Sequence, residues 1–193
     1  MMRNTIVLLL TAITSLTYVG AIVVRHEKVA ASEGTVFLQL APVDPLSLFQ
    51  GQYMNVEFMA ERRLYEGSAL NGAKSGHTLA VIELDGRNIG TVREFIPPYP
   101  TLSQKQELSS DYGAGKFLLF GVRLGSVGGN RKSQSGESRK YKIWIDQQQF
   151  LFQENMEDRY SNAKYGYFRV ASDGSYQLID LADENLNLLS ASK

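Results

Sequence analysis

Hydrophobic and polar residues follow one pattern at the N-terminus of this chain and a different one after it. Residues 6–24 form 19 consecutive positions without a charged side chain. A helix rises about 1.5 Å per residue, so this run would cover roughly 28 Å, close to the thickness of a bilayer's hydrocarbon core. The pattern predicts a transmembrane helix that contacts membrane lipid through residues 6–24. A cleaved signal peptide with a cleavage site at residues 29–31 is the alternative, but the long run and the charged residues 25–28 favour a retained anchor.

The flanks of this segment leave its orientation open. Arg3 lies before the run, and Arg25 and Lys28 lie after it, so the positive-inside count is a tie. A short tail before a long domain is nevertheless typical of a protein whose bulk is exported. Within the run, small polar residues and one tyrosine recur at helical spacing, which permits close contact with another helix in lipid. These residues are Thr11, Thr14, Ser15 and Tyr18.

The rest of the chain has the two-residue alternation of β-strands. Asp85-Gly86 and Asp173-Gly174 lie between apolar runs, and this dipeptide is a strong hairpin signal. We expect a helical turn at residues 46–50 and one short helix within residues 154–164. The predicted fold is therefore mainly β, with antiparallel hairpins in a β-sandwich or barrel-like arrangement, one short helix and an N-terminal transmembrane helix. The expected strands cover residues 35–40, 53–58, 78–84, 87–96, 117–124, 140–145, 150–153, 165–170 and 175–181.

These elements divide the chain into three parts. Residues 1–28 are a membrane anchor with short flanks, and residues 29–184 are an extracytoplasmic β-rich domain. Residues 185–193 are polar and small, and we expect a flexible tail there.

Composition narrows the chemistry. The 193 residues contain no cysteine and two histidines, which excludes disulfides, thiolate or histidine-rich metal sites and cysteine nucleophiles. We expect no metal and no cofactor, and we expect His77 in a solvated loop.

The net charge of zero hides two regions of opposite sign. Residues 116–142 carry seven bases and one acid, whereas residues 144–184 carry eight acids and three bases. We interpret the basic patch as a solvated hairpin loop, with lipid headgroups or a protein partner as alternatives and no nucleic acid. The patch comprises Arg131, Lys132, Arg139, Lys140 and Lys142.

A motif in residues 42–58 is the most distinctive feature of the sequence. It runs from Pro42 through Asp44-Pro45 and Gln50-Gly51 to Tyr53, and it resembles the signature of the GDYXXLXY family. The chain departs from that pattern at Leu46, Gln52, Val56 and Phe58. Residues 150–154, which are aromatic and end in Gln-Glu, also match.

The resemblance implies a cellular location and a topology, but it implies no reaction. Members are bacterial membrane-anchored proteins of uncharacterised biochemical role, with the domain outside the cytoplasm. They are often encoded with a polytopic membrane protein. The resemblance thus implies the bacterial inner (cytoplasmic) membrane and a single-pass topology.

The candidate functional surface joins the motif to the Gln-Glu segment. We expect no catalytic residue, because no base is placed to activate Ser47. A non-enzymatic interaction or accessory module for a polytopic membrane protein is favoured. The alternatives are an envelope ligand-binding module with a pocket near Tyr53, or a hydrolase using Asp44 and Glu154. The surface comprises Asp44, Pro45, Ser47, Gly51, Tyr53, Gln153 and Glu154.

Overall fold

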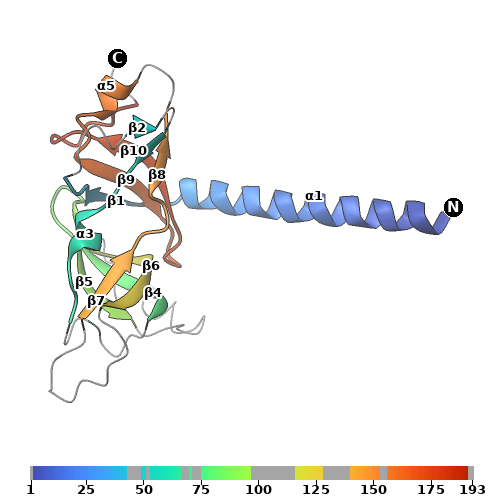
Figure 1. Ribbon diagram of the computed structural model, residues 1–193, viewed down its shortest axis with the longest axis horizontal. Helices are drawn as coiled ribbons and strands as arrows, with labels where there is room; N and C mark the ends of the chain where they lie inside the picture. The colour runs from blue at the N-terminus through green and yellow to red at the C-terminus, as the bar shows by residue number, and fades with distance from the viewer. Residues whose placement is uncertain are drawn as a thin grey trace.

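A long helix and a β-domain make up the molecule. The computed structural model describes residues 2–42, 49–50, 53–66, 70, 75–96, 116–127, 140–152 and 156–190. Helix α1 (Met2–Ala30) projects away from one side of the domain (Figure 1). Its segment Ile6–Ala30 is long and apolar enough to cross a membrane, and no part of the most apolar stretch is buried against the domain. This finding supports the predicted membrane anchor.

The described residues of the domain form three antiparallel sheets. The two larger sheets, which contain β9 and β4, occupy opposite ends of the domain. The small sheet, which contains β3, lies beside the sheet of β9 (Figure 1). Two four-residue helices, α3 (Met59–Arg62) and α5 (Glu157–Tyr160), complete the described elements. The mainly-β prediction is confirmed, with a curled, half-barrel sheet. In hydrogen-bonded order the strands are β1 (Gly34–Gln39), β9 (Tyr165–Val170) and β10 (Tyr176–Ala182); β5 (Gly90–Ile96), β4 (Gly76–Leu84), β6 (Phe117–Val127) and β7 (Lys140–Trp144); and β2 (Phe49–Gln50), β3 (Tyr53–Asn55) and β8 (Gln149–Leu151).

The strand pairs predicted from the sequence are present. β4 pairs with β5, β6 with β7, and β9 with β10, each antiparallel. In the first hairpin, Asp85 Oδ1 accepts hydrogen bonds from the amides of Arg87 and Ile89, both at 2.8 Å. This turn uses residues 85–89, so the returning strand begins at Gly90 and not at Arg87 as expected.

Other expectations need correction. Residues 49–50, expected at the end of a helical turn, form β2, because their backbone pairs with Tyr53 and Met54. The helix expected within residues 154–164 is reduced to the single turn α5 among the described residues. Helix α3 was not predicted, since one turn is too short to show helical periodicity. The alternation over residues 53–58 is confirmed: Met54, Val56 and Phe58 are buried.

One aromatic core joins the two larger sheets. Phe168 of β9 has no exposed surface, and its ring centroid lies 5.3 Å from that of Phe58 and 5.4 Å from that of Phe120 in β6. Tyr176 of β10 stacks on Phe120 with centroids 3.9 Å apart. Because β6 and β9 belong to different sheets, these rings hold the sheets together as a single unit.

Gly174 closes the β9–β10 hairpin in a conformation that other residues rarely adopt. Its φ is +83°, and a Cβ there would lie 2.5 Å from Leu79 Cδ2. Gly174→Ala should therefore cost about 1–3 kcal/mol of unfolding free energy. Urea unfolding of the full chain in mild detergent, followed by the fluorescence of Trp144, measures this loss.

The other Asp-Gly turn supplies a matched control. A Cβ on Gly86 would meet nothing within 4 Å, and the backbone of Gly86 is not left-handed. Gly86→Ala should leave the unfolding free energy unchanged or slightly raised. Equal losses in the two variants would contradict the role assigned to Gly174.

Candidate functional site

Most of the surface predicted from the sequence lies outside the described residues. The hydrolase hypothesis, which needs two carboxylates to meet, therefore stays a hypothesis. Tyr53 is the member of that surface that the structure describes. The members outside the described residues are Asp44, Pro45, Ser47, Gly51, Gln153 and Glu154.

The backbone around Tyr53 pairs with the strands that adjoin the two halves of this surface in the sequence. In β3, Tyr53 pairs with Gln50 of β2 and with Leu151 of β8. Leu151 is two residues before Gln153, so the motif and the Gln-Glu segment adjoin strands of one small sheet. The side chain of Leu151 is 76% exposed. This sheet is therefore one place where the domain presents apolar surface.

Two members of the basic patch are described, and both lie on β7. Lys140 pairs with Val127 and Lys142 with Gly125, so the two lysines share one face of the sheet. Lys140 is exposed and Lys142 is half-buried. Arg131, Lys132 and Arg139 lie outside the described residues.

A buried carboxylate that sequence reasoning missed joins α3 to the residue that follows β7. Glu61 of α3 is 2% exposed. Its Oε1 accepts hydrogen bonds from the Ile145 amide at 2.8 Å and from Gln148 Nε2 at 2.9 Å. Its Oε2 accepts from the Phe58 amide at 2.9 Å. Each oxygen is thus bound to buried donors, which makes Glu61 a structural clamp between α3 and the end of β7.

One cavity lies where α1 meets the domain. Its volume is about 690 Å³, within the range of small-molecule sites. The helix wall of this junction pocket consists of Ile22, Arg25, His26 and Val29. These residues have the spacing i, i+3, i+4 and i+7, so they form one stripe on α1. That spacing is a signal in the sequence that could have indicated a contact face.

The domain wall of the junction pocket contains both apolar and polar residues. The apolar residues include Leu79 of β4 and Val122 of β6. The polar residues include Asp146, from the β7–β8 connection, and Asp173, from the β9–β10 turn. Asp173 Oδ1 accepts a hydrogen bond from the Ser175 amide at 2.8 Å, which fixes that turn.

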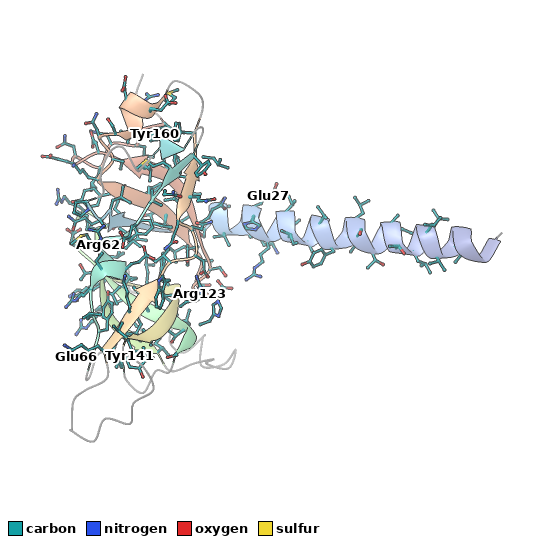
Figure 2. All side chains as sticks on the ribbon, viewed as in Figure 1. Glu27, Arg62, Glu66, Arg123, Tyr141 and Tyr160 are labelled. Carbon is teal, nitrogen blue, oxygen red and sulfur yellow. The ribbon has the colours of Figure 1, made fainter. Side chains whose placement is uncertain are left out.

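Charged side chains meet at the edge of the junction pocket. Arg123 Nε lies 2.7 Å from Asp146 Oδ1, and His77 Nε2 lies 3.9 Å from Asp146 Oδ2. Figure 2 shows Arg123 on the side of the domain from which α1 projects, and Arg62 on the opposite side. His77 is part of β4 and not of a loop, contrary to expectation. The Arg123–Asp146 pair links the basic and acidic regions of the sequence.

Tyr176 lines the junction pocket, and its phenol is unusually weakly acidic. Burial raises the pKa of Tyr176, and also that of Tyr65, to about 12. Because the unfolded chain ionises these phenols near pH 10, their contribution to stability is complete below pH 10 and is lost as the pH rises towards 12. We expect a loss of about 2 kcal/mol of unfolding free energy for each tyrosine by pH 12.

Urea unfolding followed by circular dichroism between pH 9 and 12 tests this expectation. The double variant Tyr65→Phe/Tyr176→Phe should lose most of the alkaline decline. If the variant and the natural chain decline equally with pH, other groups govern alkaline unfolding.

The part of the chain that the structure describes contains no candidate metal site. No three His, Asp or Glu residues there are grouped so that they could hold a metal ion.

Comparison with known proteins places the chain in a family. A family model described as "GDYXXLXY protein" matches residues 15–181, which include the second half of α1 and nearly all of the β-domain. No curated protein and no solved structure matches the chain.

Proposed function

Because the chain belongs to the GDYXXLXY family and carries a helix suited to spanning a membrane, we propose that it is an accessory module for a polytopic membrane protein. In this proposal α1 is a single-pass anchor in the bacterial inner membrane, and the β-domain lies outside the cytoplasm. The domain acts through contacts and not through catalysis.

The observation that carries the proposal is the short, fixed joint between anchor and domain. Three residues separate α1 from β1. The amide of Ala31 donates to Glu27 O at 2.9 Å and that of Ser32 to Val29 O at 3.1 Å, so helical hydrogen bonding continues into the joint. Val29 is buried, and Arg169 Nη1 donates to Ser32 O at 3.1 Å. These contacts tie the end of the helix to the domain.

A fixed joint determines how the domain lies on a membrane. Since α1 projects from one side of the domain, that side would face the bilayer surface (Figure 1). A domain held at that height and angle is well placed to contact the loops of a neighbour in the same membrane. A flexible tether would not provide such placement.

A second stripe on α1, the polar one predicted from the sequence, adds a surface within the membrane. It consists of Thr11, Thr14, Ser15 and Tyr18. Thr11 Oγ1 donates to Val7 O at 2.9 Å, and Thr14 Oγ1 donates to Leu10 O at 2.8 Å. Because each of these hydroxyls donates to a backbone carbonyl of its own helix, the stripe presents only weakly polar surface to the lipid. Such stripes let two helices approach closely in lipid.

Photo-crosslinking in native membranes tests the proposal. A photoreactive residue at Thr14 should yield an adduct with one polytopic membrane protein. Leu16 is the matched control, because it lies about 200° around the same helix and is 76% exposed. Adducts at neither position, or equal adducts at both, would contradict a specific helix partner.

A topology assay tests the location separately. Reporters that are active on opposite sides of the membrane, fused after residue 193, should show an extracytoplasmic C-terminus. A cytoplasmic C-terminus would overturn both the location and the proposed setting.

The junction pocket favours a second candidate function, the binding of an envelope ligand. Its volume of about 690 Å³ suits a small molecule. However, the pocket lies at the joint with α1, whereas the sequence placed the ligand site near Tyr53.

A further inference from the structure

A second cavity, the edge groove, lies between strands β1 and β5 and helix α3. It is lined by residues 38–39 of β1, residues 90–92 of β5, and residues of the segment 59–65 that begins with α3. Its volume is about 370 Å³, within the range of ligand-binding sites. Figure 2 shows Arg62, one of the lining residues, on the side of the domain opposite α1. If α1 spans a membrane, the edge groove faces away from the bilayer.

The edge groove opens where two sheet edges separate. Among the described strands, β1 is at the end of one sheet and β5 is at the end of another. The two strands touch at one bridge, where the Phe37 amide donates to Asn88 O at 2.9 Å. They are close there, because a Cβ on Gly90 would lie 2.5 Å from Val36 Cγ2. Beyond this bridge the described part of each strand has no strand on its outer edge.

The main chain of Gln39 points to the open edge of β1. On this edge, the amides of Phe37 and Ala41 donate to Asn88 O at 2.9 Å and to Glu57 O at 2.7 Å. Alternate residues of a strand direct their N–H and C=O groups to the same edge. Gln39 lies midway between Phe37 and Ala41, so its N–H and C=O also point to this edge. Gln39 is exposed and lines the groove.

The facing edge of β5 offers the same kind of groups. Ile89 O accepts a hydrogen bond from the Asp85 amide at 3.0 Å, so Ile89 and Thr91 direct their polar main-chain groups towards β4. By alternation, Val92 directs its N–H and C=O to the outer edge of β5. The groove therefore offers main-chain donors and acceptors from two strands. An extended peptide can pair with both kinds of group, whereas a free anion supplies acceptors only.

The charged side chains of the edge groove favour an acidic ligand. Its described lining contains two arginines and no acidic residue. Arg62 is compensated, because its Nη2 lies 2.7 Å from Glu57 Oε2. The Arg63 guanidinium lies 5.7 Å from the centre of the Tyr65 ring, and no carboxylate of the described residues forms an ion pair with it. A guanidinium can bind a carboxylate through two parallel hydrogen bonds.

Apolar residues also line the edge groove. Leu38 and Val92 are buried, whereas Met59 is 41% exposed. Leu64, next to Arg63, is 47% exposed. A ligand that covers Met59 and Leu64 removes apolar surface from water. The ligand that fits the groove thus combines an extended main chain with acidic and apolar side chains.

We propose that the edge groove binds an extended segment of another protein that contains acidic and apolar residues. The segment would add as a strand to the open edge of β1, through main-chain hydrogen bonds with Gln39. An acidic side chain would bind Arg63, and an apolar side chain would cover Met59. The proposal goes beyond the proposed function, because the groove lies on the side opposite α1 and requires no polytopic partner.

Fluorescence anisotropy of the full-length protein in mild detergent tests the proposal. The probe is a fluorescein-labelled, end-blocked peptide of alternating valine and glutamate, which favours an extended strand. We expect saturable binding with a Kd below about 1 mM. A peptide of alternating valine and lysine, and a valine–glutamate peptide with N-methylated amides, should each bind at least about tenfold more weakly. The first has the wrong charge, and the second lacks main-chain donors.

Variants of Arg63 test the acidic contact. Arg63→Gln should weaken binding of the valine–glutamate peptide by at least about fivefold, because it removes a charge-assisted hydrogen bond. Arg87→Gln is the matched control. Arg87 is exposed, lies in the turn before β5 and does not line the groove. Its substitution should leave the Kd unchanged.

Variants of Gln39 test strand addition. Gln39→Pro removes the N–H on the open edge, and proline is compatible with an edge strand whose N–H points outwards. It should weaken binding by at least about fivefold, whereas Gln39→Ala keeps the N–H and should bind like the natural chain. The urea midpoint of every variant checks that the domain remains folded. The N-methylated peptide tests the same hydrogen bonds on the natural chain if Gln39→Pro does not fold.

Several results would overturn the proposal. Absence of saturable binding up to about 1 mM, or equal binding of the three peptides, would show that the groove does not take an acidic strand. Equal losses in Arg63→Gln and Arg87→Gln would contradict the assigned contact. Displacement of the peptide by free glutamate or inorganic phosphate at a similar concentration would indicate a simple anion site. A self-associated chain that the peptide separates into single copies would assign the groove to a second copy.

Discussion

Phe168→Ala should lower the free energy of unfolding by about 3–5 kcal/mol. The Phe168 side chain has no exposed surface and contacts the rings of Phe58, Phe120 and Tyr176. Its removal leaves a cavity between the two larger sheets and also deletes three aromatic contacts. Urea unfolding of the full chain in mild detergent, followed by Trp144 fluorescence, gives the value.

An apolar residue on the neighbouring strand provides the control for Phe168. Ile179 of β10 is 38% exposed. Ile179→Ala should cost about 1 kcal/mol or less, because much of the side chain already contacts water. A cost for Phe168→Ala no greater than that for Ile179→Ala would show that the aromatic cluster does not join the sheets.

Glu61→Ala should be similarly destabilising, at about 3–5 kcal/mol, for a different reason. The substitution removes the acceptor of the buried Phe58 and Ile145 amides and of Gln148 Nε2. Each buried donor left without a partner costs about 1–3 kcal/mol. Glu61→Gln keeps one acceptor oxygen but turns an NH₂ group towards a donor, so we expect a loss of about 2 kcal/mol or more.

Glu57, in the same segment, is the control for Glu61. It carries the same charge but is not buried, so it shows how much of the loss depends on burial. Glu57 accepts hydrogen bonds from Arg62 at 2.7 and 3.0 Å, but this ion pair is partly exposed. Glu57→Ala should cost about 1 kcal/mol or less. If Glu57→Ala and Glu61→Ala lower the urea midpoint equally, the buried clamp is not a main source of stability.

The chain's local chemistry predicted much of the fold. The Asp85-Gly86 and Asp173-Gly174 turns were predicted because their requirements are satisfied within a few residues. Asp85 and Asp173 each accept turn amides through Oδ1. The alternation over residues 53–58 correctly indicated which side chains are buried. Such features are short-range, so one sequence is enough to recognise them.

The candidate site was less accessible to sequence reasoning. Tyr53 was chosen from the motif, and the structure adds that its backbone pairs with the strand preceding the Gln-Glu segment. The junction pocket was missed, because its helix stripe lies in α1 while Asp146 and Asp173 lie more than a hundred residues later. No spacing rule connects positions that far apart.

The sequence by itself determined the apolar helix long enough to span a membrane, the hairpins and the mainly-β class. Hydrophobic length, strand alternation and turn chemistry act over a few to about twenty residues. Tertiary structure alone decided that Glu61 would clamp Ile145, 84 residues away, and that α1 would form one wall of a charged pocket. Both arise from packing between distant segments, where the partner of a charged side chain depends on how whole elements dock.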